Sequence, residues 1–163
     1  MTLGMSDSRE DETASLDRRK AVLSRITAFA SLPPEVAEEI AGSLRAASFT
    51  PGVEVVREGD IGDQLFVIER GAAEVFTQTA AGVVLLTKLA AGDMFGEIAL
   101  LNPTRRRQAT VKATEPLDVL TLSAADFEKS LAAFPELRVD VVMAAEAMLH
   151  EKFIKRKAGP AQP

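Results

Sequence analysis

The chain has 163 residues, enough for one domain with its own hydrophobic core but too few for two full domains. Hydrophobic residues make up 47% and charged residues 26%, a composition typical of soluble globular proteins. The formal net charge of −5 argues against a surface that holds a nucleic-acid backbone, so we expect no DNA partner.

The residue types that the sequence lacks exclude several kinds of chemistry. There is no cysteine, which excludes disulfides, zinc–thiolate sites and thiol nucleophiles. The single histidine, His150, excludes the clustered histidine ligands that a metal-dependent cupin needs. We therefore expect a protein that is not an enzyme and that holds neither a metal nor a cofactor.

No segment is suited to a membrane or to export. The longest apolar runs stay well short of the roughly 20 residues of a bilayer-spanning helix. The N-terminal residues are polar and charged, unlike a secretory signal. We expect a cytoplasmic protein that does not insert into a membrane.

The chain is predicted to begin with a tail and two helices. Residues 1–16 are small, acidic and polar, so we expect a disordered tail before a folded domain at residues 17–157. Apolar residues then recur at helical spacing, first from Asp17 and again after Pro33–Pro34. The two stripes comprise Val22, Leu23, Ile26, Phe29 and Ala30, then Val36, Ile40, Leu44 and Ala47.

The middle of the chain reads as strands joined by tight turns. Runs with a period of two cover residues 53–58, 64–70, 72–79 and 83–90, and two more follow at 108–114 and 117–122. Glycine-rich turn signals separate them about every ten residues. This spacing predicts an antiparallel sandwich or barrel.

Two helices are predicted to end the domain. Ser123 suits an N-cap with Asp126 in the first turn, and the helix should continue to Ala133. A second helix should run from Pro135 to about Lys157, before a short tail at residues 158–163. Its apolar stripe comprises Leu137, Val141, Val142, Ala145, Met148, Leu149 and Phe153.

Residues 92–111 interrupt the strands with a different pattern. A glycine precedes a short helix-forming run at Glu97–Leu101, and a loop ending in arginines returns to a strand. Free N–H groups at such a helix start favour phosphate oxygens, and an arginine can hold the same phosphate through its planar fork. Glu97 would then need a hydrogen-bond donor such as a sugar hydroxyl. Phosphate and sugar together suggest a nucleotide.

These residues resemble the cyclic-nucleotide-binding domain family. Its phosphate-binding cassette reads Phe-Gly-Glu-(Leu/Ile)-(Ala/Gly)-Leu, followed by a loop and Arg-x-Ala-x-Val. The segments at 95–100 and 107–111 match both halves. The resemblance implies a mainly β fold: an eight-stranded antiparallel jelly-roll-like barrel with an N-terminal helical segment and two C-terminal helices, the last of which closes over the ligand.

The resemblance also implies a role for each site residue. Glu97 would bind the ribose 2′-hydroxyl, Arg107 the cyclic phosphate, and backbone amides around Ile98 and Ala99 the remaining phosphate oxygens. The wall for the base would be built by Leu86 and Leu89. The full set of expected ligand-binding residues is Gly96, Glu97, Ile98, Ala99, Arg107, Gln108, Ala109, Leu86 and Leu89.

Two choices within this site depend on spacing and on one residue type. Arg105, Arg106 and Arg107 stand together, and we assign the phosphate to Arg107 because its spacing to Ala109 and Val111 fits the motif. Family members with Ser or Thr at the position of Gln108 are linked to guanine recognition. Gln108 therefore favours cAMP as the ligand, with cGMP left open.

Two functions remain in competition. In the first, the domain is a cyclic-nucleotide sensor that binds its ligand without turnover and regulates an unknown effector protein or a parent channel or transporter. In the second, the same fold is a nucleotide-independent protein-interaction module. A transcription factor of this family would need a helix-turn-helix after the last helix, and the chain stops about six residues beyond it.

Overall fold

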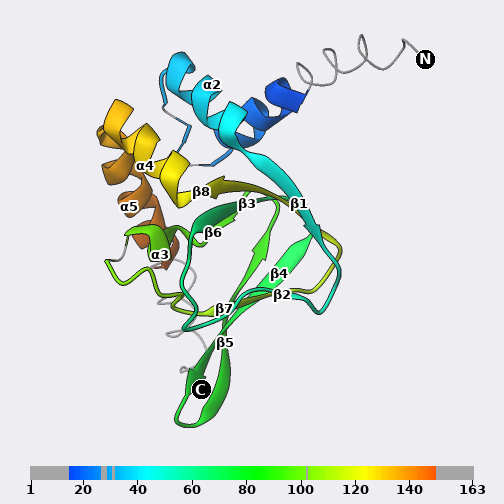
Figure 1. Cartoon of the computed structure of the whole chain (residues 1–163). Helices are drawn as coiled ribbons and strands as arrows, with labels where there is room; N and C mark the ends of the chain where they lie inside the picture. Colours follow the sequence, from blue (N-terminus) through cyan, green and yellow to red (C-terminus); the bar gives the residue numbers. More distant parts are fainter. Residues whose placement is uncertain (1–14, 27–28, 31, 102, 150–163) are drawn as a thin grey trace, which may run out of the picture.

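A computed structural model describes residues 15–26, 29–30, 32–101 and 103–149. Two four-stranded antiparallel sheets form the body, and helices lie together at one end of it (Figure 1). One sheet has the order β1-β8-β3-β6 and the other β2-β7-β4-β5. The strands are β1 (Arg45–Phe49), β2 (Glu54–Val56), β3 (Gln64–Arg70), β4 (Ala72–Thr79), β5 (Gly82–Ala90), β6 (Met94–Phe95), β7 (Thr110–Ala113) and β8 (Leu117–Ser123).

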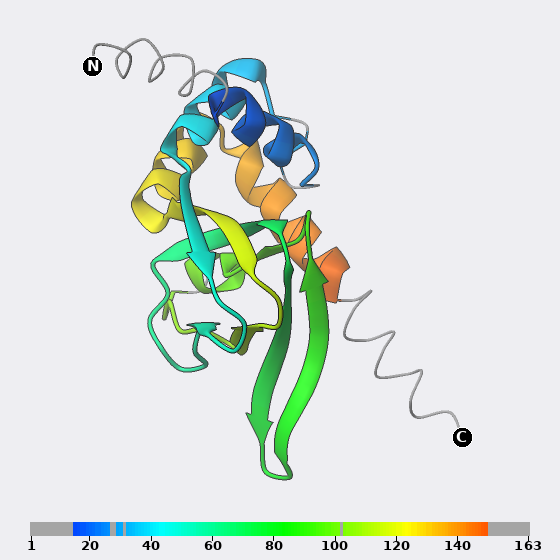
Figure 2. The ribbon, with the colours of Figure 1, turned by 90° about the vertical axis from the view of Figure 1, so that its right-hand side faces the viewer.

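The helices are α2 (Pro34–Ser43), α3 (Glu97–Leu101), α4 (Ala124–Ala133) and α5 (Glu136–Leu149), and residues 15–24 are also helical. In Figure 2, α5 runs down the side of the molecule from the helical end toward the β4–β5 hairpin. None of the described helices is long and apolar enough to cross a membrane.

Strand β3 explains how the layers are held together. Leu65 and Val67 on one of its faces belong to a buried cluster with the helices, whereas Phe66 and Ile68 on the other face belong to a cluster with the second sheet. This strand is therefore buried on both faces, because side chains alternate along a strand. The Phe66 ring stacks on that of Phe95 of β6, with centroids 4.7 Å apart.

The expected mainly β fold of eight antiparallel strands with flanking helices is confirmed, but the expected barrel is not closed. The eight strands divide into two separate four-stranded sheets that face each other across the second cluster. Within the described residues, β1, β6, β2 and β5 are unpaired on one side. The sheets pack by apolar side chains from both inner faces, as in a sandwich.

The predicted helical stripe extends too far at its C-terminal end. Leu44 already has extended backbone as the C-cap of α2, and Ala47 lies in β1 instead of a helix. The sequence of β1 carries little alternation, and its pairing with β8 decides its conformation. The Ser48 hydroxyl supports this pairing, because it donates to Asp118 Oδ1 at 2.7 Å.

The N-terminal end of the domain differs in part from expectation, whereas the C-terminal end agrees with it as far as the structure describes it. The first helix includes residues 15 and 16, which were predicted as tail, and Leu16 packs against the helix cluster. The predicted cap of α4 is confirmed, since the Ser123 hydroxyl accepts a hydrogen bond from the backbone N–H of Asp126. Residues 150–157 of the predicted last helix, with His150 and Phe153, lie outside the described residues.

Candidate ligand-binding pocket

A cavity of about 330 Å³ opens on the inner face of the second sheet, beside α3. It holds every predicted site residue except Ile98, whose side chain is outside the described part of the structure. The sequence interpretation missed five further lining residues. The lining comprises Val56, Val75, Leu86, Thr87, Leu89, Phe95, Gly96, Glu97, Ala99, Arg107, Gln108, Ala109 and Val111.

The β5 wall of the cavity depends on a bulge. Val75 pairs with Thr87 but the next residue, Phe76, pairs with Leu85, so Leu86 is an extra residue in β5. A bulge breaks strict alternation, which lets the neighbours Leu86 and Thr87 both line the cavity. Thr87 is only 6% exposed and brings a hydroxyl to a wall that was predicted to be leucine. The period-two pattern of the sequence could not reveal Thr87 as a lining residue, because the bulge changes the face of the sheet on which its side chain lies.

Arg107 is held in the cavity wall by its backbone and its side chain. Its N–H donates to Asp60 O at 2.8 Å and its carbonyl accepts from Gly59 N–H at 2.9 Å. Its guanidinium donates to the carbonyls of Gly96 at 3.0 Å and Gln64 at 2.8 Å. Burial lowers the pKa of Arg107 from its ordinary value, with Asp63 and Glu97 acting in the opposite direction.

Two glycines leave the space that the guanidinium occupies. A Cβ on Gly62 would lie 2.6 Å from Arg107 Cζ, and a Cβ on Gly96 would lie 2.8 Å from Arg107 Nη1. Gly96 also has a φ of +87°, a conformation that side chains disfavour. The cation lies 5.7 Å from the centroid of the Phe66 ring, within range of a cation–π interaction.

Glu97, the first residue of α3, is a buried carboxylate without a full set of partners. It is 1% exposed, and its Oε2 has no hydrogen-bond partner among the described residues. Burial raises the pKa of Glu97 to about 7, while a hydrogen bond from its own backbone N–H and the charge of Arg107 lower it in part. The cavity therefore presents an acceptor that still lacks a donor.

The three consecutive arginines separate to three different places. Arg105 pairs with Glu128 of α4, and Arg106 donates to Gly59 O at 2.7 Å. Arg107 alone of the three lines the cavity. Gln108 and Ala109 follow it along the rim, with Gln108 exposed.

The arrangement suits a ligand with one polar part and one apolar part. Glu97 can accept hydrogen bonds from hydroxyl groups, and Arg107 can donate to an anion. The opposite wall is mostly apolar. Among the described residues, no cluster of acidic or histidine side chains could hold a metal ion.

The cyclic nucleotide-binding domain family matches residues 46–134, more than half of the chain. The chain belongs to this family. The match includes both halves of the cassette and the β4–β5 hairpin, so it spans every described residue that lines the cavity.

Relatives of the chain include a kinase subunit and a channel. The cAMP-dependent protein kinase regulatory subunit of Schizosaccharomyces pombe is 38% identical over 112 residues, covering 69% of this chain and 26% of that protein. The potassium/sodium hyperpolarization-activated cyclic nucleotide-gated channel 4 of Oryctolagus cuniculus is 35% identical over 135 residues, 82% of this chain and 11% of that protein. The chain thus spans about a quarter or less of these relatives.

A similar solved structure is the regulatory domain of Toxoplasma gondii PKA in complex with cAMP. It superposes with a TM-score of 0.73 at 25% identity, over 83% of this chain and 50% of that one. The names of these relatives describe regulatory and channel proteins, and none describes an enzyme that converts a cyclic nucleotide.

Replacing Glu97 with glutamine should stabilise the empty protein at alkaline pH. The folded-state pKa of about 7 lies above the ordinary 4.5, so the folded protein binds more protons than the unfolded chain between these values. The free energy of unfolding therefore falls as pH rises through this window, by about 3 kcal/mol for a shift of this size. Glutamine cannot ionise and escapes this loss.

Urea unfolding should thus give similar free energies of unfolding for the wild type and Glu97→Gln at about pH 4. At about pH 8 the free energies should differ, with the variant more stable. Glu115→Gln, at an exposed turn, serves as the matched control and should show no such divergence. Equal stabilities of wild type and Glu97→Gln at alkaline pH would mean that the carboxylate is not desolvated.

Proposed function

We propose that this domain is a cytoplasmic sensor of a cyclic nucleotide, preferentially cAMP, that binds its ligand without turnover. The observation that carries the proposal is the buried Glu97 with its unpartnered Oε2, placed beside Arg107 in a mostly apolar cavity. Burying an acceptor without a donor costs free energy, and a ligand hydroxyl would remove that cost. A volume of about 330 Å³ lies within the range of small-molecule sites.

Each part of the ligand has a counterpart in the cavity. Glu97 accepts hydrogen bonds from the ribose 2′-hydroxyl, and the phosphate takes donors from Arg107 and from the backbone amides of Ile98 and Ala99. Arg107 has five N–H donors, of which the carbonyls of Gly96 and Gln64 use two. The base lies against Leu86 and Leu89, and Thr87 adds a hydroxyl beside them.

Arg107→Ala should weaken cAMP binding about 10- to 150-fold, because charge-assisted hydrogen bonds contribute about 1.5 to 3 kcal/mol. Arg107→Lys keeps the charge but loses the planar fork, so it should fall between the wild type and the alanine variant. Calorimetric titration with cAMP, cGMP and 5′-AMP measures all three proteins. Arg105→Ala should cost much less than Arg107→Ala, and equal losses would refute the assignment of the phosphate to Arg107.

Binding should also depend on pH near neutrality. The 2′-hydroxyl donates to the ionised carboxylate, whereas the pKa of about 7 leaves Glu97 largely protonated in the empty pocket below pH 7. Affinity should therefore fall by up to about tenfold per pH unit below pH 7 and level off above it. The ligand's phosphodiester keeps its charge over this range, and Arg107 is the one other titratable group among the described lining residues.

Calorimetry at pH 6.5 in two buffers of different ionisation enthalpy would count the proton that Glu97 releases, about 0.5 to 1 per ligand. The residual affinity of Glu97→Gln should be independent of pH. A wild-type affinity that is flat from about pH 5.5 to 8.5 would show that Glu97 is already ionised in the empty pocket.

We further propose that binding is signalled by movement of α5, with a hinge near residues 132–135. Leu100 of α3 and Leu137 and Val141 of α5 belong to one buried cluster, while Glu97 and Ala99 of the same short α3 line the cavity. A ligand that repositions α3 therefore changes the surface on which α5 packs. Saturating cAMP should slow amide hydrogen exchange in residues 136–149, and unchanged exchange there would contradict this mechanism.

The runner-up function is a nucleotide-independent interaction module. Val139 and Met143 favour it, because they are 57% and 63% exposed, four residues apart on α5. The buried, unpartnered Glu97 opposes it, since a domain without a ligand would gain stability from a neutral residue there. Absence of heat and of a thermal shift with every cyclic mononucleotide would favour the interaction module.

In the proposed sensor, the effector is a separate protein or a further part of a longer channel or transporter.

A further inference from the structure

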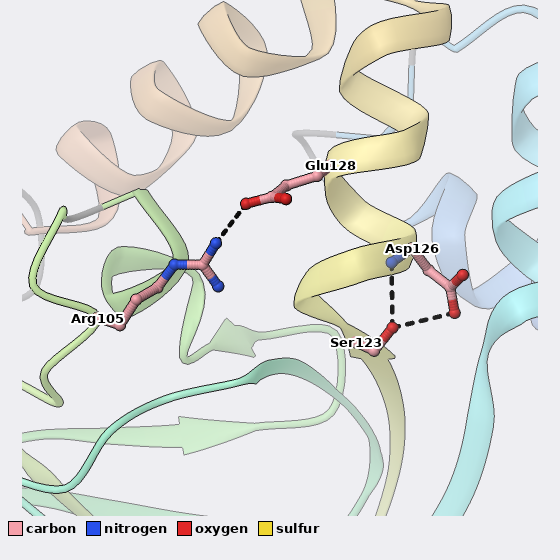
Figure 3. Close-up of polar contacts among 4 residues, drawn as sticks. All are labelled: Arg105, Ser123, Asp126 and Glu128. Atoms are coloured by element: carbon pink, nitrogen blue, oxygen red, sulfur yellow. Dashed lines mark hydrogen bonds and ion pairs between the residues drawn. The ribbon is translucent and has the colours of Figure 1, made fainter.

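Arg105 connects the loop that carries Arg107 to helix α4. Its guanidinium Nη2 donates to Oε1 of Glu128, which projects from α4 toward the loop (Figure 3). Residue 128 lies one turn after the Ser123 cap, whose hydroxyl accepts from the N–H of Asp126 at 3.1 Å. The charged pair is thus anchored at the first turns of a helix whose start is fixed.

The backbone of the same loop is fastened to residues 59–62. Gly62 N–H donates to Arg105 O at 2.6 Å, Arg106 forms a β-bridge with Ile61, and Arg107 N–H donates to Asp60 O at 2.8 Å. Fixing Arg105 therefore fixes the direction in which the chain enters the cavity two residues later.

The conformation of Arg105 shows that its position is imposed by these contacts. Its φ of +58° is the one positive value at a residue other than glycine in the described part of the chain. Arginine has no local preference for this left-handed region, so contacts outside the residue must stabilise it. The hydrogen bond from Gly62 and the pair with Glu128 are the contacts that the structure provides.

Glu128 lies in the middle of α4, about one turn before the junction between α4 and α5. Together with Leu131, Ala132, Pro135 and Arg138 it lines a shallow hollow at this junction. The pair therefore links the cavity wall to the segment at which α5 would hinge.

We propose that the Arg105–Glu128 pair is a positioning contact that holds Arg107 in its phosphate-binding orientation and couples ligand binding to α4 and α5. Neither residue lines the cavity, and the proposal rests on the proposed function. The pair is partly solvated, with side chains 31% and 59% exposed. Such pairs contribute modestly, so loss of the pair should weaken cAMP binding by about two- to fivefold.

The test is a double-mutant cycle read by cAMP calorimetry. Arg105→Ala and Glu128→Ala should each weaken binding two- to fivefold, and the double variant should be no weaker than either, because both remove one interaction. The Arg105→Glu variant should bind cAMP more weakly still, because its new carboxylate faces Glu128 with a like charge. The exchanged variant, Arg105→Glu with Glu128→Arg, should recover most of the affinity. About 0.5 M salt should reduce these differences.

A matched control and a second readout separate positioning from a general effect on the fold. Lys129→Ala, at the exposed neighbour of Glu128, should leave affinity unchanged. At saturating cAMP the wild type should show slowed hydrogen exchange in residues 124–133, and Arg105→Ala should lose that slowing. Additive losses, or no recovery in the exchanged variant, would overturn the coupling while leaving the sensor function intact. A wild type that binds no cyclic nucleotide would overturn both.

Discussion

The structure depends on a buried cation that forms no ion pair with a carboxylate among the described residues. Arg107 gives its hydrogen bonds to the carbonyls of Gly96 and Gln64, and no ion pair joins it to Glu97. A charge in this position is costly unless fixed dipoles surround it. Here the carbonyls of Gly96 and Gln64 supply these dipoles, and the absence of side chains at Gly62 and Gly96 leaves space for the guanidinium. Gly62 and Gly96 are thus part of the site, although neither has a side chain. The remaining donors of the guanidinium have no hydrogen-bond partner among the described residues, so in the proposed sensor they would donate to the phosphate.

Glu97 shows how the site opposes the stability of the fold. Its burial favours the protonated form, so at neutral pH the empty protein holds either a neutral acid or an uncompensated charge. A donor from the ligand and a proton are two alternative ways to satisfy the same oxygen. This arrangement destabilises the empty state, and the ligand of the proposed sensor would gain affinity by removing that cost. In the proposed sensor, the cost of the empty site would thus favour ligands that bring a hydroxyl to Glu97.

The sequence predicted best what short-range chemistry determines. Ser123 caps α4 because a hydroxyl and the N–H three residues later meet wherever a helix starts, and the cassette was recognised because its residues are contiguous. The sequence was a poor guide to the features that depend on pairing between distant strands. Ala47 fits a helical stripe, yet it lies in β1, which forms by pairing with β8. The partners in this pairing are far apart in sequence: Ser48 and Asp118 are separated by 70 residues. Thr87 was missed for the same reason, since a bulge against β4 turns it into the cavity. Closure of a barrel likewise depends on whether the edge strands of the two sheets pair with each other, and no local sequence pattern determines that pairing.

The position of the helices restricts how the cavity can communicate with them. They pack on the face of β3 that carries Leu65 and Val67, opposite the face of Phe66 that supports Arg107. A strand buried on both faces and hydrogen-bonded on both sides resists displacement, so the sheet itself is a poor route for movement. Two routes pass around it. The first is α3, whose Glu97 lines the cavity while Leu100 packs among the helices. The second is the loop at residues 103–107, which reaches α4 through Arg105 and Glu128. Both begin in the cassette, so in the proposed sensor the residues assigned to the sugar and phosphate, more than those assigned to the base, would start the proposed movement of α5.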